Sequence, residues 1–236
     1  MCGRFTLRLP PQELQAFFDL MRVEDYQPRY NIAPTQDIVA IRQTGEGRVG
    51  SLMHWGLIPH WAKDRKMAAR MINARGETVA DKPSFRDSFK RQRCLIPADG
   101  FYEWKDVGEK YKQPYHITLT DEQPIAMAGL WSEWTDPDSQ EVIESCTVIT
   151  TTANSVMREL HERMPVILSR ESWSVWLNSD LPDGQSSREA LESLLMPFSA
   201  AEMQYRPVSR LVNSPRNETP DCLDAPSKRA ENRLFE

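Results

Sequence analysis

Short apolar runs interrupted by turn-forming residues dominate the hydrophobic pattern of the chain. Runs rich in β-branched and aromatic residues, bounded by Gly, Pro or Asp, are typical of strands. Six such runs occur, at residues 37–43, 48–57, 93–105, 114–120, 123–134 and 145–153. Apolar residues at helical spacing predict four helices, at residues 10–20, 152–160, 169–178 and 186–196. The pattern therefore predicts mainly antiparallel strands with a few helices between them.

This order of elements favours an α+β fold with a curved antiparallel, barrel-like β core flanked by several helices. The first helix has a proline start, and the last is expected to open with a capping box formed by Ser186 and Glu189. No repeat or linker divides the chain, so residues 1–213 are interpreted as one domain. From Ser214 the sequence turns polar, and residues 214–236 are expected to form a mobile tail.

Composition places the chain among ordinary globular proteins, with 236 residues, 40% of them hydrophobic and 27% charged. No apolar run approaches the ~20 residues of a membrane span, and no signal peptide is recognisable. The cysteines are far apart and form no CxxC pair, which argues against a disulfide framework and against a zinc site; they are Cys2, Cys94, Cys146 and Cys222. A cytoplasmic monomer without metal or cofactor is expected.

Charge is distributed unevenly. The net charge is −5, yet residues 60–93 carry ten Lys and Arg against four Asp and Glu. Residues 1–100 hold 16 basic and 11 acidic side chains, whereas residues 101–236 hold 13 and 23. Such asymmetry indicates a polyanion-binding face on an acidic protein, although a solvated face with scattered counter-charges gives the same pattern.

Cys2, directly after the initiator methionine, is the first candidate for chemistry. Its small side chain favours removal of Met1, which would leave a free α-amine beside a thiol. Their reference pKa values are about 7.7–8.0 and about 8.5, so both would be partly deprotonated near neutral pH. Such an aminothiol traps aldehydes as a thiazolidine, or it can act as an N-terminal nucleophile with the amine as base. An inert terminal cysteine is the third interpretation.

Four further stretches concentrate polar residues among apolar ones. They are "YNIAPTQ" with Asn31, "MINARGET" with Asn73 and Arg75, "IPADGFYEWK" with Glu103, and "LHERMPVIL" with His161. Each has an ordinary structural explanation when taken singly. Asn31 can form a turn, the "MINARGET" residues an ion-pair network, Glu103 can face solvent, and His161 can cap a helix end.

Together with "MCGRFT", these stretches resemble the SRAP family, the SOS-response-associated peptidase-like proteins. The resemblance runs from residue 1 to about residue 213. It also includes "WGLIPHWAK", "RCLIPADGFYEW", "MAGLW", "TTAN" and "PVSRLVN". It implies recognition of abasic sites in single-stranded DNA during the response to DNA damage. It also implies a covalent thiazolidine DNA–protein crosslink through the N-terminal Cys2, which shields the lesion.

The resemblance implies roles for individual residues. Cys2 would supply amine and thiol, and Asn73 would hold the amine or the sugar oxygen. Glu103, desolvated among aromatic residues, would shuttle protons in lyase-like Schiff-base chemistry. His161 would protonate the sugar ring oxygen.

DNA contacts are assigned to five residues. Arg4, Arg75 and Arg86 are expected to bind phosphates, Trp61 to stack on bases, and Asn31 to lie beside them. Trp55 is more simply interpreted as a core residue.

Two alternatives remain. A cysteine peptidase or amidohydrolase would use Cys2 with His161 or Glu103, and a non-catalytic nucleic-acid-binding module would bind without a covalent product. The resemblance also implies that the protein is nucleoid-associated when bound to DNA.

Overall fold

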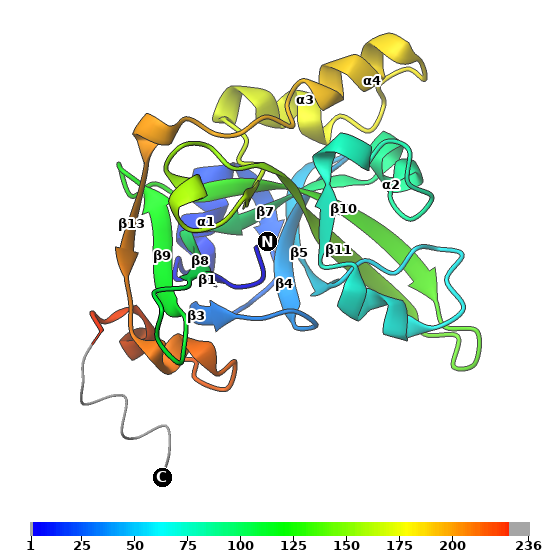
Figure 1. Ribbon diagram of the computed structural model, residues 1–236. Coiled ribbons are helices and arrows are strands. Elements are labelled where there is room, and N and C mark those ends of the chain that lie inside the picture. Colours follow the sequence, from blue (N-terminus) through cyan, green and yellow to red (C-terminus); the bar gives the residue numbers. More distant parts are fainter. Residues whose placement is uncertain (1, 227–236) are drawn as a thin grey trace.

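The strands that surround the core form a closed barrel. The computed structural model describes residues 2–226 (Figure 1). The barrel has five strands, in the order β11, β10, β7, β4 and β5. Their bounds are β4 Asp37–Thr44, β5 Gly47–Trp55, β7 Arg93–Ala98, β10 Ile125–Thr135 and β11 Val142–Thr152. Neighbours pair antiparallel except at the closure, where β11 runs parallel to β5 through Ser145–His54 and Cys146–Trp55.

Three short strands extend this sheet. β2 (Leu20–Val23) and β6 (Asn73–Arg75) run parallel to β5 and β11, and β12 (Arg163–Pro165) pairs antiparallel with β11. β6 and β12 carry two of the polar motifs singled out in the sequence. They pair with opposite edges of β11, so the two motifs flank this strand.

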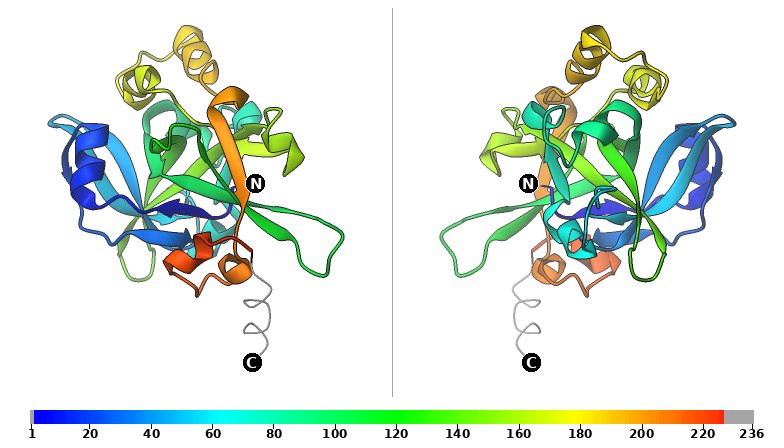
Figure 2. Two further views of the ribbon diagram at one scale, coloured as in Figure 1. Left: turned by 90° about the vertical axis from the view of Figure 1, so that its left-hand side faces the viewer. Right: turned by 90° about the vertical axis from the view of Figure 1, so that its right-hand side faces the viewer.

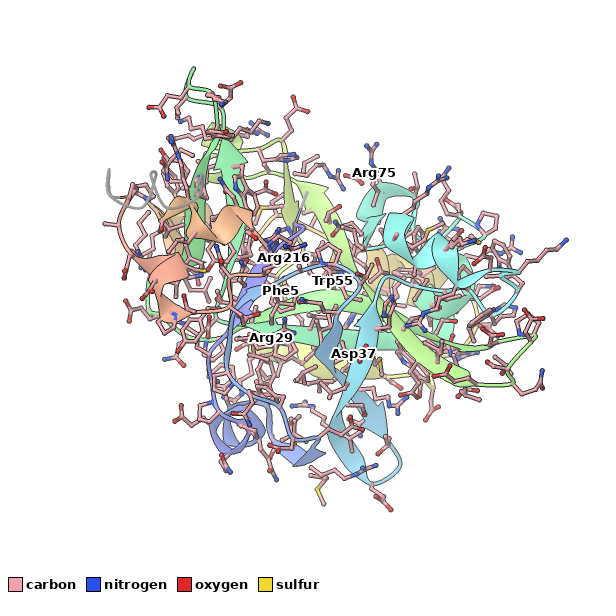
Figure 3. The ribbon with its side chains drawn as sticks, turned by 90° about the horizontal axis from the view of Figure 1, so that it is seen from below. Phe5, Arg29, Asp37, Trp55, Arg75 and Arg216 are labelled. Carbon is pink, nitrogen blue, oxygen red and sulfur yellow. The ribbon has the colours of Figure 1, made fainter. Side chains whose placement is uncertain are left out.

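A second, antiparallel sheet packs beside the barrel (Figure 2). Its five strands lie in the order β13, β9, β8, β1 and β3. Their bounds are β1 Phe5–Leu7, β3 Arg29–Ile32, β8 Gly100–Lys105, β9 Gln113–Leu119 and β13 Met203–Pro207. Phe5 of β1 meets the barrel residue Trp55 edge to face, with ring centroids 5.1 Å apart (Figure 3). This contact joins the two sheets in one apolar core.

Four α-helices cover the sheets: α1 Pro11–Phe18, α2 Arg86–Arg91, α3 Trp173–Leu177 and α4 Gln185–Glu192. α1 begins at a proline and ends at Asp19, whose φ of 55° stops the helix. Short 3₁₀ segments complete the elements. They are η1 Arg65–Arg70, η2 Gly76–Thr78, η3 Met157–Glu159, η4 Arg170–Ser172, η5 Ala200–Glu202, η6 Arg210–Asn213 and η7 Pro220–Leu223.

The structure confirms the α+β class with a barrel-like β core and corrects several details of the sequence prediction. Residues 93–105 form two strands, because the chain leaves β7 at Asp99 and enters the other sheet as β8. Of the helix expected at residues 152–160, only the η3 turn forms. α4 starts at Gln185 after Gly184, with no side-chain cap, so the expected capping box of Ser186 and Glu189 does not form.

The predicted tail is packed over its first part. Glu218 accepts hydrogen bonds from the backbone amides of Tyr30 and Asn31 at 2.5 and 2.7 Å and pairs with Arg29 at 3.0 Å. Cys222 is fully buried. Residues 214–226 therefore belong to the folded body, whereas residues 227–236 lie outside the described part. Within residues 2–226, no helix is both long and apolar enough to cross a membrane.

Candidate active site

Cys2 lies inside the protein, in the short segment that leads into β1. Its side chain is fully buried, although it stands next to the end of the chain. The backbone N–H of Arg4 donates a hydrogen bond toward the Cys2 sulfur. The antiparallel pairing of β1 with β8 carries the segment across the core and fixes its path.

Asn73 holds the backbone of Cys2. β6 runs beside β11, with Asn73 opposite Val148. The Asn73 Nδ2 donates to the Cys2 carbonyl oxygen at 2.8 Å. The Asn73 Oδ1 is buried, and no partner for it is recorded in the described part of the chain. A buried amide oxygen of this kind is a ready acceptor for a nearby N–H.

Glu103 lies on β8, and only 5% of its surface is exposed. The simple strand interpretation, in which this carboxyl faces solvent, is therefore wrong. Burial raises the pKa of Glu103, while a positive charge on His161 acts in the opposite direction. The carboxyl thus lies near His161, and it holds its proton more strongly than an exposed glutamate.

The Cys2 thiol differs from its expected state. Burial, followed by the negative charge of Glu103, raises the pKa of Cys2 to about 12. The sequence expectation of a partly ionised thiol near neutral pH is therefore corrected. The thiol keeps its proton until a base removes it, and Glu103 lies near enough to influence it.

His161 follows the η3 turn and is held by the backbone. Its Nδ1 accepts a hydrogen bond from the Arg163 N–H at 2.9 Å. A neutral imidazole that accepts at Nδ1 carries its proton on Nε2. This assigns the tautomer, and it makes Nε2 the donating atom.

Arg163 fastens this turn to η2 and β11. Its guanidinium forms a two-pronged ion pair with Glu77, the second contact being 3.0 Å, and its Nη2 also donates to the Thr150 carbonyl oxygen at 2.6 Å. Hydrogen bonding from Arg163 lowers the pKa of Glu77. The "MINARGET" and "HERMP" stretches are thus joined directly, a link that their sequence positions did not reveal.

The four candidate catalytic residues therefore meet in one place. The Cys2 carbonyl accepts a hydrogen bond from Asn73, and the charge of Glu103 influences the pKa of the Cys2 thiol. His161 in turn influences the pKa of Glu103. They come from the N-terminal segment, β6, β8 and the turn after η3. A buried thiol, a proton-holding carboxyl and an imidazole can together supply a nucleophile and move protons.

Two residues expected to contact DNA are turned inward. Asn31 is fully buried, and its Nδ2 donates to the carbonyl oxygens of Ser214 and Asn217 at 2.9 and 2.7 Å. Its Oδ1 accepts from Arg4 Nη1 at 2.7 Å, and the same nitrogen reaches the Val212 carbonyl oxygen at 2.7 Å. Asn31 is therefore a structural link, which corrects its assignment as a DNA contact. Burial lowers the pKa of Arg4.

The other expected DNA contacts lie on the surface. Trp61 is 47% exposed, a large fraction for a tryptophan. Arg75 is exposed at the end of β6 and lies at the periphery (Figure 3). Arg86 is exposed at the start of α2, 3.6 Å from Asp87. Trp55, by contrast, is fully buried and donates to the Ile72 carbonyl oxygen, as expected for a core residue.

Comparison with known proteins places the chain in a family. The model of the SOS response associated peptidase (SRAP) family matches residues 1–215. The chain belongs to the SRAP family. The abasic site processing protein YoaM of Bacillus subtilis is 43% identical to it over 228 residues, covering 95% of this chain and 98% of that protein.

More distant relatives also match most of this chain. YedK of Escherichia coli, also named an abasic site processing protein, is 31% identical and covers 94% of this chain and 99% of its own. HMCES of Xenopus tropicalis, with the same designation, is 34% identical over 95% of this chain and 78% of its own. A crystal structure of a Bacteroides thetaiotaomicron protein superimposes with a TM-score of 0.83 at 27% identity, over 95% of this chain and 99% of that one.

Residues that could hold a metal are not grouped near the site. Across residues 2–226, no three His, Cys, Asp or Glu side chains converge in a way that suits an ion. Sequence reasoning missed Arg163, whose amide holds His161, and Glu218, which accepts from the backbone amides of Tyr30 and Asn31. Arg163 lies in the "LHERMPVIL" motif, which is a signal for its role, whereas Glu218 lies in the polar segment that was predicted to be a tail.

Proposed function

We propose that this SRAP protein captures abasic sites in single-stranded DNA as a covalent thiazolidine through Cys2, after removal of Met1. Abasic site processing is the activity named for its relatives in Bacillus subtilis and Escherichia coli. The observation that carries the proposal is the burial of Cys2 against Asn73 and within the field of Glu103. A cysteine needed only as a small apolar residue requires neither neighbour.

The chemistry proceeds in two steps. The α-amine attacks the aldehyde of the ring-opened sugar and water leaves, which gives a Schiff base. The thiol then adds to the imine carbon, its proton passes to the nitrogen, and the five-membered ring closes. The amine makes the first attack, so a protonated thiol is no obstacle if a base beside it accepts its proton during the second step.

The neighbouring residues suit these proton movements. Glu103, whose pKa is raised, binds a proton more readily than an exposed carboxylate, and it serves both the departing water and the thiol. His161 donates a hydrogen bond from Nε2 to the sugar ring oxygen and polarises it as the ring opens. The Asn73 Oδ1 accepts from the new α-amine and orients it.

The DNA strand is held from outside the site. Arg75 and Arg86 contact phosphates, and Trp61 stacks on a base beside the lesion. Phosphate contacts tolerate any sequence, as does stacking, which suits recognition of a missing base rather than of a base.

Crosslinking to a single-stranded oligonucleotide with one abasic site tests the proposal. Protein shown by mass spectrometry to begin at Cys2 is expected to give a retarded band that survives denaturation and is absent with an intact oligonucleotide. Cys2→Ala keeps the amine and loses the thiol, so it is expected to give a band only when borohydride traps the Schiff base. Cys222→Ala, at another buried cysteine, is the matched control and is expected to crosslink normally.

Two outcomes would favour other functions. Absence of a band from folded protein that begins at Cys2, with cleavage of a peptide library, would favour an N-terminal cysteine hydrolase. Equal protection of lesion DNA by Cys2→Ala and by unmodified protein would favour a non-covalent binding module.

A further inference from the structure

A polar cavity opens on the face of the five-stranded sheet opposite Glu103. We call it the outer-face pocket. Its volume is about 310 Å³, and it is lined by Arg8, Asp99, His116, Thr118, Glu122, Gln204, Tyr205 and Arg206. None of these residues takes part in the proposed capture of DNA lesions.

Strand register separates the pocket from the candidate active site. His116 lies opposite Tyr102 on β8 and opposite Arg206 on β13. Side chains of paired residues share a face, and successive residues alternate. Glu103, the residue after Tyr102, therefore points to the other side of the sheet, and the two sites lie back to back.

The floor of the pocket is a built polar network. His116 is 2% exposed, and its Nε2 lies 3.1 Å from the Thr6 hydroxyl, which also bonds to Asp99. Glycine is needed at position 100, because a Cβ there would overlap the His116 ring. The Thr6 hydroxyl gives its one proton to the Asp99 carboxylate, so His116 Nε2 donates to Thr6. The His116 Nδ1 is then left as an acceptor.

Two arginines flank this floor. Arg8 Nε pairs with the Asp99 carboxylate at 3.1 Å, and this ion pair offsets the negative charge of Asp99. Within the described residues, the terminal nitrogens of Arg8 have no recorded partner. Arg206 Nη1 donates a hydrogen bond to the Leu223 carbonyl oxygen at 2.6 Å. Burial, together with the charges of Arg8 and Arg206, lowers the pKa of His116 to about 3, so the field of both cations reaches the floor. Glu122 is an exposed acid at the pocket and opposes them in part.

We propose that the outer-face pocket binds a phosphate group between Arg8 and Arg206, with Thr118 and Gln204 as further donors. Guanidinium forks match phosphate oxygens, and a protonated phosphate can in addition donate to His116 Nδ1. The phosphate can come from a free phosphorylated compound or from the backbone of a DNA strand that crosses this face. The proposal does not depend on the chemistry of Cys2.

The imidazole signals of His116 in NMR spectra provide the test, because they report binding without any activity. They would be assigned by comparison with His116→Gln, in protein carrying Cys2→Ala so that no crosslink forms. Inorganic phosphate, a nucleoside monophosphate and a single-stranded oligonucleotide without a lesion would each be titrated. Saturable shifts with the first two are expected if the source is a free compound, and shifts with the oligonucleotide alone if it is a DNA backbone.

Arg206→Gln is expected to weaken this binding about tenfold or more, as befits the loss of a charge-assisted hydrogen bond. Arg22→Gln, an exposed arginine on β2 of the other sheet, is the matched control and is expected to bind as the parent does. Absence of saturable shifts with all three probes would overturn the proposal. Equal binding by Arg206→Gln and Arg22→Gln in folded protein would also overturn it, whatever the outcome of the crosslinking experiment.

Discussion

Replacement of Glu103 by Gln separates two effects of this carboxyl that act in opposite directions. The negative charge of Glu103 raises the pKa of Cys2, so its removal makes the thiol more acidic and, by itself, more reactive. Loss of the proton shuttle acts the other way, because general acid–base catalysis contributes about 10²–10⁴-fold in rate. This range corresponds to about 3–5 kcal/mol of activation free energy. A modest increase in thiol acidity lowers the barrier by less than that.

We therefore expect Glu103→Gln to crosslink about 10²–10⁴-fold more slowly, while Cys2 reacts faster with iodoacetamide at a given pH. The crosslinking rate is measured in a single turnover with saturating abasic oligonucleotide, and alkylation is followed by mass spectrometry across a pH series. Glu162→Gln, at an exposed glutamate next to His161, is the matched control. Crosslinking by Glu103→Gln at or above the parental rate would refute the role of Glu103 in proton transfer.

The same substitution has a predicted effect on stability. The folded state raises the pKa of Glu103, so its stabilising contribution is present at acid pH and is lost as pH rises through that pKa. At a pH above that pKa the parent protein bears the cost of a buried carboxylate. We expect Glu103→Gln to lose less stability than the parent in urea unfolding as pH rises from acid to alkaline, and an equal loss in both proteins would contradict the assignment of burial as the main influence.

Three further predictions concern other parts of the molecule. The pKa of His116 is lowered to about 3 from an ordinary 6.5, so its contribution to stability should be lost as pH falls below about 6.5. The free energy of unfolding in urea should fall by about 2–3 kcal/mol between pH 7 and pH 4.5 in the parent but not in His116→Gln. Equal acid sensitivity of the two proteins would exclude His116 as the cause. Asn31→Ala should lower the unfolding free energy by about 2–4 kcal/mol, because several buried carbonyl groups lose their donor, with little change in the DNA affinity of the folded protein; a selective loss of affinity would restore Asn31 as a DNA contact. Trp61→Ala should weaken binding of single-stranded DNA by about 1–3 kcal/mol in fluorescence titrations but keep the crosslinking rate at saturating DNA, and unchanged affinity would remove Trp61 from the strand path.

The fold class was predictable because alternating and apolar runs with turn residues at their ends identify strands locally. How those strands pair is decided at a distance. The run at residues 93–105 looks continuous, and only the tertiary structure shows that the chain changes sheet at Asp99. Closure of the barrel depends on a parallel pairing of β5 with β11, which lie about a hundred residues apart and leave no local signal.

The candidate catalytic residues were predictable from motifs, whereas their environment was not. Burial moves the Cys2 thiol far from its reference pKa, and burial cannot be read from position 2 of a sequence. Asn31 stands in a motif and still proves to be a structural link. Polarity suggested a free tail after Ser214, yet the polar side chain of Glu218 packs inward and accepts hydrogen bonds from two backbone amides.

The mass of the crosslinked peptide tests the central claim most directly. After crosslinking, free thiols are alkylated and the N-terminal peptide with its attached sugar fragment is analysed by mass spectrometry. A thiazolidine predicts attachment at Cys2, a mass equal to the sum of both partners less one water, an unalkylated sulfur and no change on treatment with borohydride. An adduct at another residue, or a Cys2 adduct whose sulfur is alkylated and which borohydride reduces, would contradict capture by the aminothiol.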